Sequence, residues 1–121
     1  MKQDEFKKGE ILIYQTKEGP NLEVRLEENT VWLTLNQIAS LFEVQKAAVS
    51  KHIKNIFNSN ELDPSSTVSK METVQLEGDR WVKRTLTYYN LDMIISVGYR
   101  VNSKRATQFR IWATKVLREH I

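Results

Sequence analysis

The chain has 121 residues, a formal net charge of +3 and no cysteine. This length suits one domain with its own core, and the lack of cysteine excludes disulfides and thiolate metal sites. No stretch approaches the ~20 apolar residues of a membrane-spanning helix, and we expect no secretory signal in the charged start MKQDEFKKGE. These features predict a cytoplasmic domain without a membrane partner.

Positive charge is concentrated in the last third of the chain. Residues 80–121 contain nine Lys or Arg and only two acids, whereas residues 1–33 contain seven acids and five bases. A basic side of this kind is typical of proteins that face a polyanion such as DNA. A solvated basic helix face would give the same pattern.

The beginning of the chain predicts an antiparallel meander that follows a flexible tail over residues 1–9. Gly19-Pro20 and Glu28-Asn29 are turn signals, and the runs beside them are rich in β-forming or alternating residues. The expected strands cover residues 10–16, 22–27 and 31–33.

Residues 34–57 give the strongest functional signal, because they predict two short helices joined by a tight turn. Thr34 is the expected N-cap of the first helix, and Gln37 completes a capping box. Apolar residues then recur at helical spacing along both helices. The predicted buried positions are Ile38, Ala39, Leu41, Phe42, Val49, Ile53, Ile56 and Phe57.

The other side of the second helix is basic, and the stretch from Gln45 to Asn60 contains no acid. A helix-turn-helix places such a helix in the DNA major groove, where cations bind phosphates and polar side chains contact base edges. The expected phosphate contacts are Lys46, Lys51 and Lys54. The candidates for base contacts are Gln45, Ser50 and Asn55.

One residue of the turn departs from the usual motif. Glu43 occupies a position that is usually Gly, because the backbone there often needs a positive φ. A Glu in that conformation costs on the order of 1 kcal/mol. Any two amphipathic helices joined by a short loop give similar spacing, so a helix pair without DNA contact is the alternative.

A β-hairpin is predicted after this helix pair. Residues 67–77 and 81–89 are rich in Thr, Val and aromatic residues, and they flank Gly78-Asp79. A hairpin in this place is typical of the wing of a winged helix-turn-helix, and a purely structural hairpin is the alternative. The expected DNA contacts of the wing are Arg80, Lys83 and Arg84.

Two helices are predicted at the end of the chain. The first covers residues 91–99 and has Asn90 as its N-cap, and the second has Ser103 as its N-cap and continues to the last residue. The final helix has no C-cap signal, so we expect this chain to be the N-terminal part of a longer protein. The residues expected to face the core are Ala106, Phe109, Trp112, Ala113, Val116 and Leu117. Those expected on the opposite faces are Lys104, Arg105, Gln108, Lys115 and Arg118.

The sequence contains few of the residue patterns that are typical of catalytic sites. His52 and His120 have no partner at metal-ligand spacing, and no Gly-rich phosphate loop or Ser-centred elbow is present. The sequence therefore predicts no enzyme activity, no catalytic residues, no cofactor and no metal.

The segments together resemble a known family. The run YYNLDMIISVGYRVNSKRATQFRIWATKVL, residues 88–117, is very similar to the RhuM family of virulence-associated proteins, which occur in bacterial genomes and mobile elements. The upstream segments EILIYQT, VWLTLNQIASLFEV, HIKNIF and ELDPSSTVSK resemble the same family. A weaker resemblance connects the chain to Bro-N and KilA-N domains, which implies a DNA-binding module of a phage-type regulator. It rests on Lys104, Ala106, Phe109, Trp112, Val116 and Leu117.

The sequence thus predicts an α+β domain over residues 10–121, with a small antiparallel sheet, a winged helix-turn-helix and two C-terminal helices. The expected function is regulatory binding of double-stranded DNA, and the final helix could add a homodimer interface. The alternative is a protein-interaction module that docks a repressor or associates with itself.

Overall fold

The computed structural model describes residues 10–16 and 21–120. The predicted tail over residues 1–9 and the predicted Gly19-Pro20 turn lie outside the described residues. Among the described helices, none combines the length and the apolar character of a membrane span.

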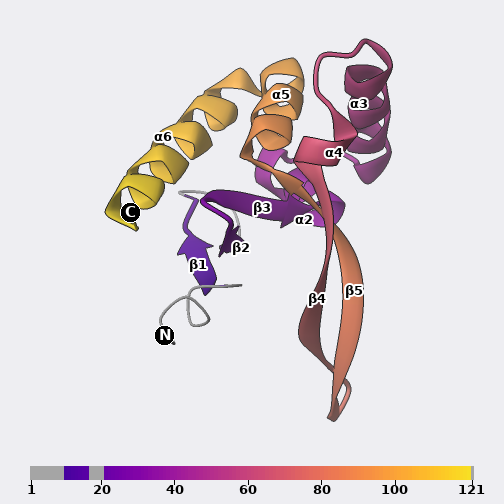
Figure 1. The fold of residues 1–121 in the computed structure, drawn as a ribbon, viewed down its shortest axis with the longest axis vertical. Helices are drawn as coiled ribbons and strands as arrows, with labels where there is room; N and C mark the ends of the chain where they lie inside the picture. Colours follow the sequence, from indigo (N-terminus) through magenta and orange to yellow (C-terminus); the bar gives the residue numbers. More distant parts are fainter. Residues whose placement is uncertain (1–9, 17–20, 121) are drawn as a thin grey trace.

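The strands form one antiparallel sheet of five strands in the order β1-β2-β3-β5-β4 (Figure 1). The predicted meander is confirmed, and its β2–β3 turn has a positive φ at both Glu28 and Asn29, as a two-residue type I′ turn requires. The hairpin joins the same sheet, because β3 pairs with β5. The bounds are β1 Glu10–Tyr14, β2 Leu22–Glu27, β3 Thr30–Thr34, β4 Val68–Glu77 and β5 Arg80–Asn90.

Five helices of the described residues accompany the sheet, and the α+β prediction is confirmed. The short α4 was not predicted; it begins where Pro64 occupies the first turn and the Asp63 side chain accepts a hydrogen bond from the Ser65 N–H. The predicted Asn90 cap is confirmed, since its side chain accepts from the Met93 N–H. The bounds are α2 Leu35–Phe42, α3 Lys46–Asn58, α4 Pro64–Thr67, α5 Leu91–Val101 and α6 Ser103–Glu119.

The N-cap prediction for α6 was wrong by one residue. Ser103 is already the first helical residue, and the Asn102 side chain accepts the hydrogen bond from the Arg105 N–H at 3.3 Å. The reason is that α5 continues to Val101, so Asn102 is the single residue left between the two helices with a non-helical backbone.

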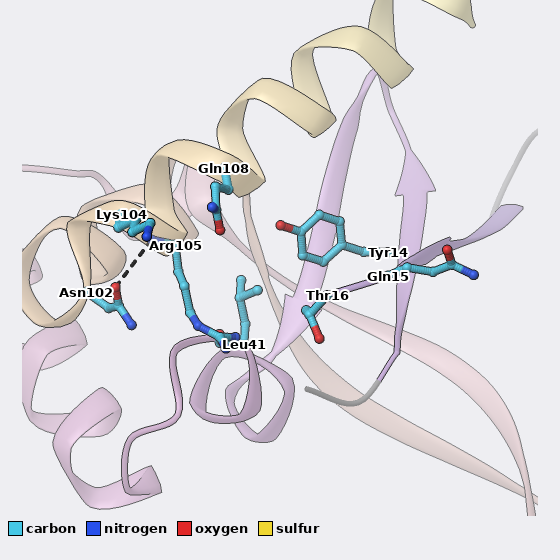
Figure 2. A pocket seen from close by; sticks show the side chains of 8 residues that line it. All are labelled: Tyr14, Gln15, Thr16, Leu41, Asn102, Lys104, Arg105 and Gln108. Carbon is cyan, nitrogen blue, oxygen red and sulfur yellow. Dashed lines mark hydrogen bonds between the residues drawn. The ribbon is translucent and has the colours of Figure 1, made fainter. Parts of the chain in front are cut away.

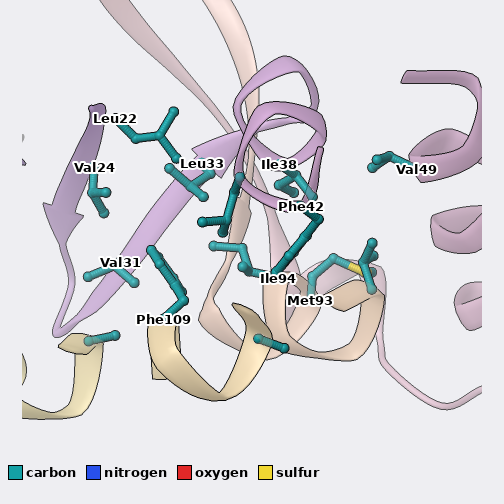
Figure 3. Close-up of a cluster of buried hydrophobic side chains, with 14 of the residues drawn as sticks. Leu22, Val24, Val31, Leu33, Ile38, Phe42, Val49, Met93, Ile94 and Phe109 are labelled. Atoms are coloured by element: carbon teal, nitrogen blue, oxygen red, sulfur yellow. The ribbon is translucent and has the colours of Figure 1, made fainter. Parts of the chain in front are cut away.

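The main core lies between the sheet and the helices, and Figure 3 shows strand side chains such as Leu33 facing Ile38, Phe42, Ile94 and Phe109. The predicted positions in α2 are all buried, and in α3 only Phe57 is partly exposed. Trp112 was expected in the core, but it is partly exposed at the edge, against Tyr14 at 5.0 Å between ring centroids. A second small cluster, on the other side of the sheet, contains Trp32, Met71 and Tyr88.

Gly98 allows α5, α6 and α2 to meet closely. A Cβ at this position would lie 2.5 Å from Phe42 Cζ and 2.7 Å from the Ala106 Cβ, both of which belong to buried residues. Gly98→Ala gains up to about 1 kcal/mol of helix propensity, but overpacking a tight core costs about 1–3 kcal/mol. We expect a net loss of stability, measured as a lower urea midpoint at unchanged slope. A variant more stable than the parent would show that α5 and α6 separate easily.

Candidate nucleic-acid interface

A complete capping box fixes the start of α2. The Thr34 hydroxyl accepts from the Gln37 N–H at 3.2 Å, and the Gln37 side-chain oxygen accepts from the Thr34 N–H at 2.9 Å. The Gln37 amide nitrogen also donates to the Glu23 carbonyl at 2.8 Å, which ties α2 to β2. The predicted capping box is confirmed, and it orients the helix pair relative to the sheet.

Three residues, 43–45, connect α2 to α3. Glu43 adopts the left-handed conformation, with φ 57° and ψ 47°, and the Val44 N–H donates to the Ala39 carbonyl at 3.0 Å. The backbone conformation usually associated with Gly in this turn is therefore present, with a Glu in it.

Arg105 holds this turn from α6. Its guanidinium donates to the Leu41 carbonyl at 2.9 Å and lies 3.2 Å from the Glu43 carboxylate. The sequence placed Arg105 on a face of α6 opposite the apolar stripe, and in the structure its guanidinium contacts the end of α2. The long side chain reaches the C-terminal end of α2, where free carbonyl groups attract a cation.

Two substitutions at Glu43 separate backbone strain from the ion pair. Glu43→Gly removes the left-handed strain of about 1 kcal/mol and also the carboxylate, whereas Glu43→Gln removes only the charge. The ion pair is partly exposed and should contribute about 0.2–1 kcal/mol. We expect the Gly variant to exceed the Gln variant by about 1 kcal/mol in free energy of unfolding. Equal stability of the two variants would mean that the turn is not strained.

Helix α3 packs on one side only. Val49, Ile53 and Ile56 are buried, and the predicted contact residues are all exposed on the remaining surface. The structure therefore brings six of the nine predicted site residues onto one helix and its N-cap residue, Gln45. They are Gln45, Lys46, Ser50, Lys51, Lys54 and Asn55.

The charges of α3 are uncompensated within the part of the chain that the structure describes. No ion pair there involves Lys46, Lys51 or Lys54, whereas other cations, such as Arg84 and Arg100, are paired with a carboxylate. The first turn of α3 has no acid, and its N-cap makes no side-chain capping bond. Lysines and the positive helix N-terminus thus add to one positive surface.

The hairpin residues Arg80, Lys83 and Arg84 do not form one group. The β4–β5 register pairs Leu76 with Trp81 and Val74 with Lys83, so Lys83 shares a face with Trp81. Arg80 and Arg84 lie on the opposite face. The sequence prediction treated the three residues as one group. Neighbouring residues of a strand, such as Lys83 and Arg84, point to opposite faces, so the group is divided.

A carboxylate also neutralises part of the hairpin charge. Arg84 donates to both carboxylate oxygens of Glu77, at 2.9 and 2.6 Å, and this hydrogen bonding lowers the pKa of Glu77. Figure 1 shows the hairpin as an arm whose tip lies at the opposite end of the molecule from α3. The arm therefore does not place its cations beside those of α3.

The distal part of the arm exposes apolar side chains that the sequence reasoning missed. Val74, Leu76 and Trp81 are 55%, 58% and 70% exposed, and the register places all three on one face. The signal was present in the sequence, since the alternation of Val74 and Leu76 continues to the turn.

Residues 10–16 and 21–120 contain no group of three acidic or histidine side chains close enough together to bind a metal ion. His120 lies beside Glu10 and the Val116 carbonyl, which leaves it at the end of α6.

The C-terminal part of this fold corresponds to a known family. Residues 66–121 match the Virulence protein RhuM family. The RhuM-family segment contains β4, β5, α5 and α6, and it confirms the predicted RhuM resemblance for that part of the chain. Helices α2 and α3 precede the segment. No curated protein and no solved structure matches the chain.

Proposed function

We propose that this virulence-associated domain binds double-stranded DNA, with α3 in the major groove. The supporting observation is the exposed, acid-free face of α3, on which Lys46, Lys51 and Lys54 have no ion-pair partner among the described residues. An α-helix fits the major groove of DNA. Lysines that are not paired with a carboxylate of the protein are available to bind DNA phosphates.

The roles follow from position on the helix. Lys51 and Lys54 are one turn apart, and they suit successive phosphates along a groove wall. Gln45 and Ser50 lie toward the N-terminal part of α3, from which side chains of a recognition helix contact base edges. Asn55 can pair with adenine through its amide. The arm contributes little to this surface, because its tip lies at the opposite end of the molecule from α3 and Arg84 is paired with Glu77.

The salt dependence of binding tests the proposal. In a fluorescence anisotropy titration against a pool of genomic fragments, three lysine–phosphate contacts give a slope of about −2.7 for log affinity against log salt. Steep weakening with salt would support DNA binding through phosphate contacts, and a slope of about −2.7 would fit the three lysines of α3. Absence of binding at low salt, with a folded protein, would reject it.

A second candidate function is self-association through the arm. Residues 72–85 contain three acids and three bases, so the arm carries no net charge to attract DNA, yet it exposes Val74, Leu76 and Trp81. β4 is an edge strand of the described sheet. Antiparallel pairing with β4 of a second copy around Met71 would place Lys70 opposite Glu72 twice, and Val68 opposite Val74 twice.

Charge exchange tests this second function. If two copies pair through β4, Lys70→Glu should produce a monomer in light scattering, because the substituted carboxylate would then face that of Glu72 across the edge. The double variant Lys70→Glu/Glu72→Lys should restore the dimer. A parent chain that is monomeric at high concentration would exclude this edge as an interface.

A further inference from the structure

A polar cavity lies where the beginning of α6 meets the end of α2 and the end of β1. It has a volume of about 650 Å³, which is within the range of small-molecule sites. Figure 2 shows Lys104, Arg105 and Gln108 on one wall, Leu41 below them and Tyr14 opposite. This cavity has no part in the proposed DNA contact of α3.

The main evidence for a ligand in the cavity comes from Tyr14. Its residue is only 8% exposed, and its ring packs edge-on against Phe109 at 5.1 Å between centroids. Its hydroxyl points into the cavity in Figure 2, and no described residue forms a hydrogen bond with it. The ring is buried while the hydroxyl is open to the cavity, so the hydroxyl can form a hydrogen bond with a molecule bound there.

The charged groups that line the cavity favour the binding of an anion. Lys104 forms no ion pair with any described residue, and Arg105 contributes a second cation, only partly balanced by Glu43. The positive end of α6, a helix of 17 residues, adds to the same potential. Burial raises the pKa of Tyr14, against an opposing effect of Arg105, so the hydroxyl stays protonated at neutral pH and can donate.

We propose that this cavity binds a small phosphorylated metabolite, with the phosphate held by Lys104 and the Tyr14 hydroxyl at the beginning of α6. A phosphate suits this site because its three terminal oxygens can accept from an ammonium group, a hydroxyl and the amide of Gln108 at the same time. The remaining volume accommodates the body of the molecule.

Arg105 connects this cavity to the turn before α3. The same guanidinium that lines the cavity holds the Leu41 carbonyl and the Glu43 carboxylate. A bound phosphate competes with Glu43 for that guanidinium and so alters the α2–α3 turn. The effect of the ligand on DNA affinity rests on the proposed function of α3, whereas binding of the ligand does not.

Calorimetry and NMR without DNA test the site, with AMP and inorganic phosphate as probes and adenosine as the uncharged comparison. We expect saturable binding of AMP and phosphate, no binding of adenosine, and backbone shifts at Lys104, Gln108 and Glu43. Tyr14→Phe keeps the packed ring and should weaken AMP binding at least about tenfold, because it removes one hydrogen bond to a charged group. The matched control Tyr99→Phe removes a hydroxyl outside the cavity, which accepts hydrogen bonds from Thr107 and Arg110, and it should leave AMP binding unchanged.

The lysines provide a second, independent comparison. Lys104→Gln should weaken AMP binding, whereas Lys115→Gln on the same helix should not. The double variant Lys51→Gln/Lys54→Gln should keep AMP binding, so a loss of DNA affinity and a loss of this site are distinguished. Absence of saturable binding of both anions, or unchanged AMP affinity in Tyr14→Phe and Lys104→Gln, would overturn the proposal. Unchanged DNA affinity in an AMP-saturated protein that binds DNA would overturn the connection through Arg105.

Discussion

Reversing the charge of Lys51 and Lys54 together should abolish DNA binding while the domain stays folded. Both side chains are exposed on α3, and neither forms an ion pair with a described residue, so their replacement by Glu disturbs no internal contact. Two carboxylates would then face the phosphates that the lysines are proposed to hold. Anisotropy measures the loss of binding, and circular dichroism with thermal unfolding checks the fold.

A matched control comes from α6. Lys115 and Arg118 are also exposed and also three residues apart on a helix, and Lys115→Glu/Arg118→Glu changes the net charge by the same amount. If general attraction to DNA explains binding, both double variants lose it equally. If α3 is the contact surface, the α6 variant binds nearly as the parent does. The neutral variant Lys51→Gln/Lys54→Gln should reduce the magnitude of the salt slope by about 2.

Phe109→Ala should cause the largest loss of stability, about 3–5 kcal/mol. Phe109 is completely buried, and it packs against Tyr14 and Trp112, with centroid distances of 5.1 and 5.6 Å. Truncation leaves a cavity between α6 and the sheet that rigid neighbours cannot fill. Trp112→Ala should cost less, about 1–2 kcal/mol, because the indole is already partly exposed.

Guanidinium unfolding of the two variants measures this order. A cost for Trp112→Ala equal to or above that of Phe109→Ala would contradict the packing at this edge of the core. A lower slope in either variant would indicate a change in the denatured or native compactness and not a simple loss of contacts. Neither residue is proposed to contact DNA.

Much of the local structure was determined by short-range signals in the sequence. The capping box of Thr34 and Gln37, the turn at Glu28-Asn29 and the cap at Asn90 depend on residues at most three positions apart. The buried stripe of α3 follows from helical periodicity, and the remaining exposed face contains the proposed site. Signals of this kind act within one element, so the sequence shows them directly.

Contacts between distant segments decided the rest. Only the packed fold shows that Arg105 holds the turn at Glu43, 62 residues earlier in the chain. The cavity around Tyr14 arises where β1, α2 and α6 meet, and no single element contains it. The helix pair and its basic face could be predicted from the sequence, because capping and periodicity are local. The tertiary structure decided which cations remain unpaired, because pairing depends on which carboxylates the fold brings within reach.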